Sequence, residues 1–164
     1  QAEPKGVELR IVSVAELPLY NEDLDGEQAP AAVKVWKAAV AACDGVLIAS
    51  PETNYGLSAP LKNALDWASR YPSNLWKGKA GAIVSTGGGA GGARGQLQLR
   101  QVGVFLDITF VNAPEIAIKR FEKKYFDHET GDLISDTWRQ RVGELLDRLI
   151  KLVSITRSVS AETF

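Results

Sequence analysis

The chain has 164 residues, of which 45% are hydrophobic and 24% charged, and its formal net charge is −1. This length and composition predict a single soluble globular domain over residues 1–164, with a sizeable core. The near-neutral charge argues against nucleic-acid binding and against attachment to a membrane surface, and no apolar run approaches the roughly 18 residues of a membrane span. The single cysteine, Cys43, excludes an intrachain disulfide and a cysteine-rich metal site.

Strand and helix patterns alternate in the first half of the chain. Residues 7–14 alternate partly between apolar and polar side chains and predict a strand. After a polar loop, a helix is predicted from Pro30 to about Cys43, with its apolar residues on one face. The short apolar run 45–50 predicts a second strand, and Ser58 marks the start of the next helix.

The alternation continues to the end of the chain. Residues 80–86 and 108–112 predict strands, and a helix is predicted between them over residues 95–106. A long helix over residues 135–158 follows a polar excursion. Strands that alternate with helices predict a parallel sheet with helices on both faces.

The helix predicted over residues 95–106 carries two apolar stripes. One holds Leu97, Val104 and Phe105, and the other, almost opposite, holds Leu99, Val102 and Leu106. A helix that lies on one sheet needs a single apolar stripe. We therefore expect the second stripe to contact a partner subunit; burial inside the same domain is the alternative.

Two unusual loops follow neighbouring strands of the predicted sheet. They are "PETNYG" at residues 51–56 and "STGGGAGGAR" at residues 85–94. In open parallel sheets, ligands bind beyond the carboxyl ends of the strands. The two loops are therefore expected to form the rim of one crevice.

Five glycines in ten residues need a physical reason, because glycine inside an element costs about 0.5–1 kcal/mol relative to alanine. The loop could be a flexible surface segment, a backbone cradle for a phosphate, or a bare floor that lets a flat ring approach the main chain. We favour the floor for residues 86–92, and the other two interpretations stay open.

The side chains offer little catalytic chemistry of their own. The only histidine, His128, stands in a polar, turn-like stretch and is expected at the surface. A Ser-His-Asp or Cys-His arrangement would have to use this one residue. If the chain is an enzyme, its chemistry is expected to come from a bound cofactor, with no catalytic side chain and no metal.

The segments "SPETNYGLSAPLKNALDWASR", "STGGGAGGARGQLQLRQVGVFLD" and "FVNAPE" resemble the NADPH-dependent FMN reductase family, and within it the plant-type NAD(P)H:quinone oxidoreductases. The resemblance implies a flavodoxin-like, three-layer α/β/α fold with strand order 2-1-3-4-5. It also implies one FMN per subunit, NADPH or NADH as the reductant, dimers that pair into tetramers, and a cytoplasmic location.

The resemblance also implies which residues bind the cofactor. They are Pro51, Glu52, Thr53, Asn54, Tyr55, Ser85, Thr86, Gly87, Gly88, Gly89, Gly91, Gly92 and Arg94. Thr53 replaces an aromatic residue of the family pattern, and Tyr55 is a substitute ring two positions later. Arg94 is expected near a helix N-terminus, where a cation is disfavoured. It could contact the NADPH phosphate, form an ion pair across a subunit interface, or be solvated.

One family element has no match in this sequence. The family opens with a strand and a Gly-Ser-x-Arg-x-x-Ser loop that holds the FMN phosphate. We expect the residues that supply them to lie upstream of Gln1, and a truncated chain that holds FMN poorly is the alternative.

The expected function is ping-pong transfer of a hydride from NAD(P)H to FMN and then of two electrons to a quinone or a similar acceptor, such as FMN, an azo dye or chromate. The alternatives are a non-catalytic flavodoxin-like interaction protein and an electron carrier.

Overall fold

The computed structural model describes residues 6–161 and divides into two compact units. The helical unit consists of Gln1–Cys43 and Pro60–Leu75, and the sheet unit consists of Asp44–Ala59 and Trp76–Phe164. A single flavin-binding domain over the whole chain stays a prediction.

The sheet unit contains four parallel strands. They are β1 (Gly45–Pro51), β2 (Ala80–Gly87), β3 (Thr109–Phe110) and β4 (Ile116–Lys119). β1 pairs with one edge of β2 from Gly45↔Ala80 to Pro51↔Thr86. The other edge of β2 pairs first with β3 and then with β4. The predicted parallel α/β architecture is therefore confirmed, with β1 on one side of β2 and with β3 and β4 on the other side.

The prediction of a strand over residues 7–14 is wrong, because this segment joins no ladder. A strand is stabilised only when its backbone groups pair with a neighbour, and the Ile11 side chain here is fully exposed. The strand predicted over residues 108–112 is shorter than expected. Pro114 lacks the N–H that a ladder needs, and pairing with β2 resumes only at β4, which the sequence analysis did not predict.

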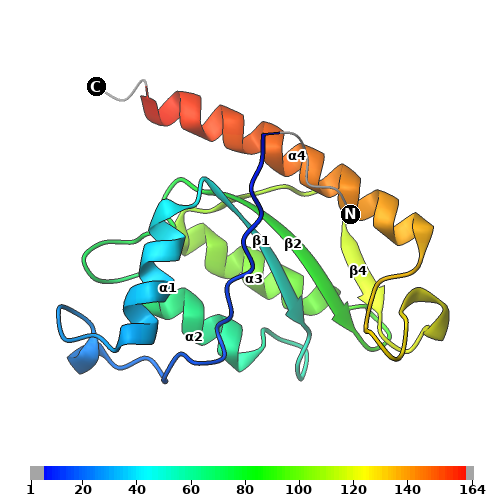
Figure 1. Ribbon diagram of the computed structural model, residues 1–164, viewed down its shortest axis with the longest axis horizontal. Coiled ribbons are helices and arrows are strands. Elements are labelled where there is room, and N and C mark those ends of the chain that lie inside the picture. The colour runs from blue at the N-terminus through cyan, green and yellow to red at the C-terminus, as the bar shows by residue number, and fades with distance from the viewer. Residues whose placement is uncertain (1–5, 162–164) are drawn as a thin grey trace. The chain divides into compact units, whose positions relative to one another are not determined.

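Helices α3 (Ala93–Leu106) and α4 (Asp136–Ala161) cover opposite faces of this sheet. Side chains alternate along β2, so that Ala80 and Ala82 face Leu145 and Leu149 of α4. Ser85 points the other way and contacts α3. Figure 1 shows α4 lying across β1, β2 and β4, and its contacts with all three strands agree. The 3-10 helix η2 (Lys123–Tyr125) lies in the connection between β4 and α4.

One apolar stripe of α3 is exposed and the opposite one is buried. Leu97, Val104 and Phe105 are 68%, 83% and 72% exposed, whereas Leu99 and Leu106 are buried. The two apolar stripes of this helix are present as predicted, one buried and one exposed, and contact of a stripe with a partner subunit stays a prediction.

The helical unit holds the 3-10 helix η1 (Glu22–Leu24), α1 (Ala31–Ala42) and α2 (Ala59–Trp67), whose first residue belongs to the sheet unit. Val33 of α1 and Trp67 of α2 form its core with Ala29. The Tyr20 ring packs edge-on against Trp67, with 5.0 Å between the ring centroids. Both helices therefore bury their apolar residues on the segment that precedes α1.

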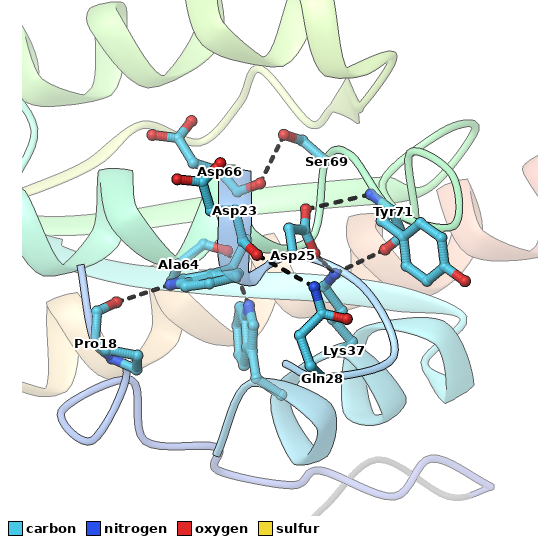
Figure 2. A network of polar contacts seen from close by, with 11 residues as sticks. Pro18, Asp23, Asp25, Gln28, Lys37, Ala64, Asp66, Ser69 and Tyr71 are labelled. Atoms are coloured by element: carbon cyan, nitrogen blue, oxygen red, sulfur yellow. Dashed lines mark hydrogen bonds and ion pairs between the residues drawn. The ribbon is translucent and has the colours of Figure 1, made fainter. Parts of the chain in front are cut away.

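Polar contacts tie this preceding segment to the two helices, as Figure 2 shows. The Trp67 indole N–H donates to the Pro18 carbonyl at 2.7 Å. The Lys37 ammonium group contacts the Asp25 carboxylate and donates to the Tyr71 carbonyl at 2.7 Å. The side chains of Lys37 and Asp25 are only 11% and 3% exposed. Removing either partner would leave the other as a buried, uncompensated charge, which is strongly destabilising.

Over residues 6–161, no helix combines the length and the apolar character that crossing a bilayer requires. The same residues hold no group of three or more His, Cys, Asp or Glu side chains that could bind a metal ion.

Candidate functional site

Two loops meet beyond the carboxyl ends of β1 and β2, as the sequence predicted. Between them lies an open hollow of about 540 Å³. Its walls are formed by Glu52, Asn54, Tyr55, Gly88, Gly89, Ala90 and Arg94. Six of these seven residues are among those that the sequence analysis expected to bind the cofactor. Ala90 was not among them. The hollow lies entirely within the sheet unit.

The loop after β1 is a tight turn that presents two side chains to the hollow. Thr53 and Gly56 bond to each other through both backbone N–H groups, at 3.1 and 2.9 Å. Asn54 and Tyr55 between them have φ angles of 48° and 67°. Positive φ at both central residues is the signature of a type I′ turn. For tyrosine this backbone costs about 1–2 kcal/mol, and strain of this kind concentrates at functional sites.

Glu52 links this loop to the start of α3. Its carboxylate accepts from the Arg94 backbone N–H at 3.1 Å and from the Arg94 guanidinium at 3.2 Å. The N-cap residue Gly92 supplies no side-chain cap, so Glu52 satisfies one of the free N–H groups of the first helical turn. A carboxylate is also favoured at this positive end of the helix. The pairing explains how a cation can stand there: Arg94 is neutralised from within the same chain.

Arg94 also stacks on the exposed Tyr55 ring. The guanidinium carbon lies 4.1 Å from the ring centroid, and the Arg94 side chain remains 46% exposed. Tyr55 is 72% exposed. The stack holds the aromatic ring and the cation together at the rim, where both can still meet a ligand.

The second half of the glycine loop is anchored tightly to the sheet. Gly91 and Gly92 have φ angles of 61° and 98°. A Cβ on Gly91 would run into the Ala117 carbonyl, and a Cβ on Gly92 would lie 2.5 Å from the Ser85 hydroxyl oxygen. Only glycine meets both requirements, the left-handed backbone and the close approach to β2 and β4.

The first half of the loop is open. A Cβ on Gly88 or Gly89 would meet nothing within 4 Å. The backbone N–H groups of Gly88, Gly89 and Ala90 donate to no acceptor among residues 6–161. These three residues line the hollow, so its wall combines bare main chain with free hydrogen-bond donors.

The remaining predicted residues do not line the hollow. Pro51 and Gly87 end their strands, and Thr53 closes the turn. The Ser85 hydroxyl is buried and donates to the Gly91 carbonyl at 3.0 Å. Thr86 pairs with Ile118, whose side chain packs on the α4 face, and only its backbone reaches the site, where its carbonyl accepts from Glu52 N at 2.9 Å.

Two glutamines of α3 were missed by the sequence analysis. The Gln98 side-chain oxygen accepts from Leu57 N at 2.6 Å and so holds the end of the first loop. Gln96 is only 2% exposed and hydrogen-bonds to Ser85. Its position was the available signal, since it stands three residues before Leu99 and therefore on the same helical face as one of the two apolar stripes.

A sequence model described as NADPH-dependent FMN reductase matches residues 1–123. The chain belongs to the NADPH-dependent FMN reductase family. Membership makes it an NAD(P)H-dependent oxidoreductase and confirms the resemblance seen in its motifs.

Several members of the family are similar over most of the chain. The NADPH:quinone oxidoreductase of Arabidopsis thaliana is 45% identical over 143 residues, which cover 86% of this chain and 72% of that protein. A 2-hydroxy-1,4-benzoquinone reductase of Burkholderia sp is 38% identical over 147 residues, covering 88% and 79% of the two chains.

Solved structures agree on the fold. The flavoenzyme NAD(P)H:(acceptor) oxidoreductase of Paracoccus denitrificans aligns with a TM-score of 0.78 and 26% identity, over 91% of this chain and 81% of that one. An oxidoreductase of Corynebacterium diphtheriae aligns with a TM-score of 0.55 and 18% identity, over 77% and 64%. The flavodoxin-like class predicted from the sequence is confirmed.

The hollow fits the ring portion of the family's flavin. Side chains are missing at Gly88 and Gly89, where a flat ring needs close approach to the main chain, and free N–H donors stand beside them. A flavin ring carries oxygen and nitrogen acceptors that such donors can bind. The family's phosphate loop has no counterpart among residues 6–161, so the described site fits the ring rather than the whole cofactor.

Proposed function

We propose that this chain is an FMN-dependent NAD(P)H:quinone oxidoreductase. The relatives from Arabidopsis thaliana and Burkholderia sp are named as quinone reductases, and the Paracoccus denitrificans structure is that of a flavoenzyme that uses NAD(P)H. FMN, when bound, takes a hydride from NAD(P)H and passes two electrons to an acceptor, which no side chain of the chain could do reversibly.

The observation that carries this proposal is the open half of the glycine loop. The free N–H groups of Gly88, Gly89 and Ala90 would hold the acceptor atoms of the ring and stabilise negative charge at the wall of the hollow. The absence of side chains at Gly88 and Gly89 leaves room for two flat groups, the ring and the nicotinamide or quinone, against the same wall.

Side chains at the rim have supporting roles in this proposal. Asn54 would donate to polar atoms of the ring, and Tyr55 would cover its edge. Arg94 would contact the phosphate of NADPH with the part of its guanidinium that Glu52 leaves exposed. The quinone itself is expected to need few specific contacts, because it enters the slot that the nicotinamide has left.

The direct test is an FMN titration of the purified full-length protein, followed by removal of free flavin. We expect a yellow protein whose colour bleaches with NADPH without oxygen and returns with benzoquinone. A protein that stays colourless would refute the proposal. A yellow protein that NADPH does not bleach would favour a flavodoxin-like binding protein or electron carrier.

We also propose that the chain assembles into a homodimer or homotetramer through α3. The exposed stripe of Leu97, Val104 and Phe105 supports this proposal, since three large apolar side chains on one helix face favour burial in an interface. Light scattering of the wild type and of Val104→Glu tests this proposal. We expect the mass of a dimer or tetramer for the wild type and a smaller mass for the variant. A monomeric wild type would refute the proposal. A cytoplasmic location stays a prediction.

A further inference from the structure

Gln96 is a buried polar side chain on the face of α3 that packs on the sheet. Its amide nitrogen donates to the Ser85 hydroxyl and to the Ile116 carbonyl, both at 2.8 Å. Ser85 passes the connection on by donating to the Gly91 carbonyl at 3.0 Å. We call this chain of contacts from Gln96 through Ser85 to Gly91 the glutamine relay.

The chemistry of the two ends fixes the direction of the relay. The Ile116 carbonyl can only accept, so the amide group that faces it must be the NH₂. The Gly91 carbonyl can also only accept, so the Ser85 hydroxyl must donate to it and accept from Gln96. Each proton therefore has one place to go, and the relay specifies a single arrangement of the groups it joins.

The relay extends from the anchored half of the glycine loop to the open half. The Gly91 N–H donates to the Gly88 carbonyl at 3.1 Å. In a trans peptide the carbonyl and the following N–H point in opposite directions. Holding the Gly88 carbonyl toward Gly91 therefore turns the Gly89 N–H away from Gly91, and that N–H is one of the free donors on the hollow wall.

We infer that Gln96 is a positioning residue for the flavin, which acts through Ser85 and Gly91 to orient the free N–H group of Gly89. The inference rests on the proposed function, because it assigns that donor to a flavin ring. Gln96 does not line the hollow, so its substitution can affect flavin only through the loop or through the start of α3.

The first test compares Gln96→Leu, which keeps the size of the side chain and removes its donors, with the wild type. We expect the dissociation constant for FMN to rise about tenfold or more, and the visible circular dichroism of the bound flavin to change. Two controls separate positioning from stability. Leu106→Ala destabilises the same helix far from the relay, and Gln140→Leu makes the same chemical change at an exposed position of α4.

Both controls are expected to keep the FMN dissociation constant within about twofold of the wild type. The inference is overturned if Gln96→Leu does the same, or if Leu106→Ala weakens FMN binding as much as Gln96→Leu does. In the second case, general loss of stability explains the effect.

The second test uses a double-mutant cycle and does not need flavin. Ser85→Ala cuts the relay in its middle. Amide hydrogen exchange in the double variant with Gln96→Leu is therefore expected to be no faster than in the more affected single variant. In the chain without flavin, both single variants should speed hydrogen exchange of the Gly91 amide, which donates to the Gly88 carbonyl, and Leu106→Ala should not. A wild type that binds no FMN would refute the proposed function, while unchanged exchange in Gln96→Leu would refute the relay itself.

Discussion

Gly88 and Gly91 stand three residues apart in one loop, yet the structure uses them in opposite ways. A side chain at Gly91 would collide with the Ala117 carbonyl, and its φ of 61° is left-handed. A side chain at Gly88 would meet nothing within 4 Å. The first glycine is required by the fold, and the second is required only if something else must approach the backbone. The comparison teaches that packing accounts for Gly91, whereas at Gly88, which lines the hollow, packing gives no reason for a glycine.

The largest effect is expected for Gly91→Ala. The left-handed backbone costs an alanine about 1–2 kcal/mol, and forcing β4 away from the loop adds about 1–3 kcal/mol. The free energy of unfolding, measured by chemical denaturation, should fall by about 2–5 kcal/mol. Gly88→Ala is the matched control and should change it by no more than about 0.5 kcal/mol. Equal losses of unfolding free energy in Gly91→Ala and Gly88→Ala would show that the anchored and open halves of the glycine loop do not differ.

Gly88→Val tests binding instead of stability, because it fills the hollow without disturbing the fold. Its branched side chain would occupy the space in which the ring or the nicotinamide approaches the main chain. Flavin affinity or the NADPH-driven rate should fall by about tenfold or more, while the free energy of unfolding stays within about 0.5 kcal/mol. Full activity in this variant would show that the open wall is not a binding surface.

Arg94→Ala sharpens the role of the rim beside the open glycines. If the exposed part of the guanidinium contacts the NADPH phosphate, the KM for NADPH should rise by about three- to tenfold with little change in kcat. Steady-state kinetics with NADPH and NADH measure this effect. Unchanged KM values for both reductants would limit Arg94 to its contacts with Glu52 and Tyr55.

Glu52→Gln is expected to lower the stability only slightly. The variant keeps the shape of the side chain and one acceptor for the Arg94 backbone N–H, but it loses the charge that favours the start of α3. Since Arg94 is about half exposed, the pair contributes about 1 kcal/mol or less. Thermal unfolding of the variant at low and high salt measures the effect. A larger loss in Glu52→Gln than in Gly91→Ala would place the main anchor of the site in the first loop.

Much of the site could be predicted from the sequence because it depends on local patterns. Apolar runs bounded by turn residues located β1 and β2, and strand ends in a parallel sheet locate the ligand edge. Two strand predictions failed where the outcome depends on distant partners. Residues 7–14 have the pattern of a strand but join no ladder, and β4 follows an interruption at Pro114 that no local pattern could bridge.

The sequence by itself determined the alternation of strands and helices, the family, and the two loops that carry the site, because residue spacing and glycine content act over short distances along the chain. Only the tertiary structure decided which glycines are crowded and which are open, because that depends on how near Ala117, Ser85 and the hollow come to each one. It also decided that Glu52 neutralises Arg94 and that Gln96 reaches Ser85. Those partners stand 42 and 11 residues apart in the sequence, and only the packing of α3 against the sheet brings them together.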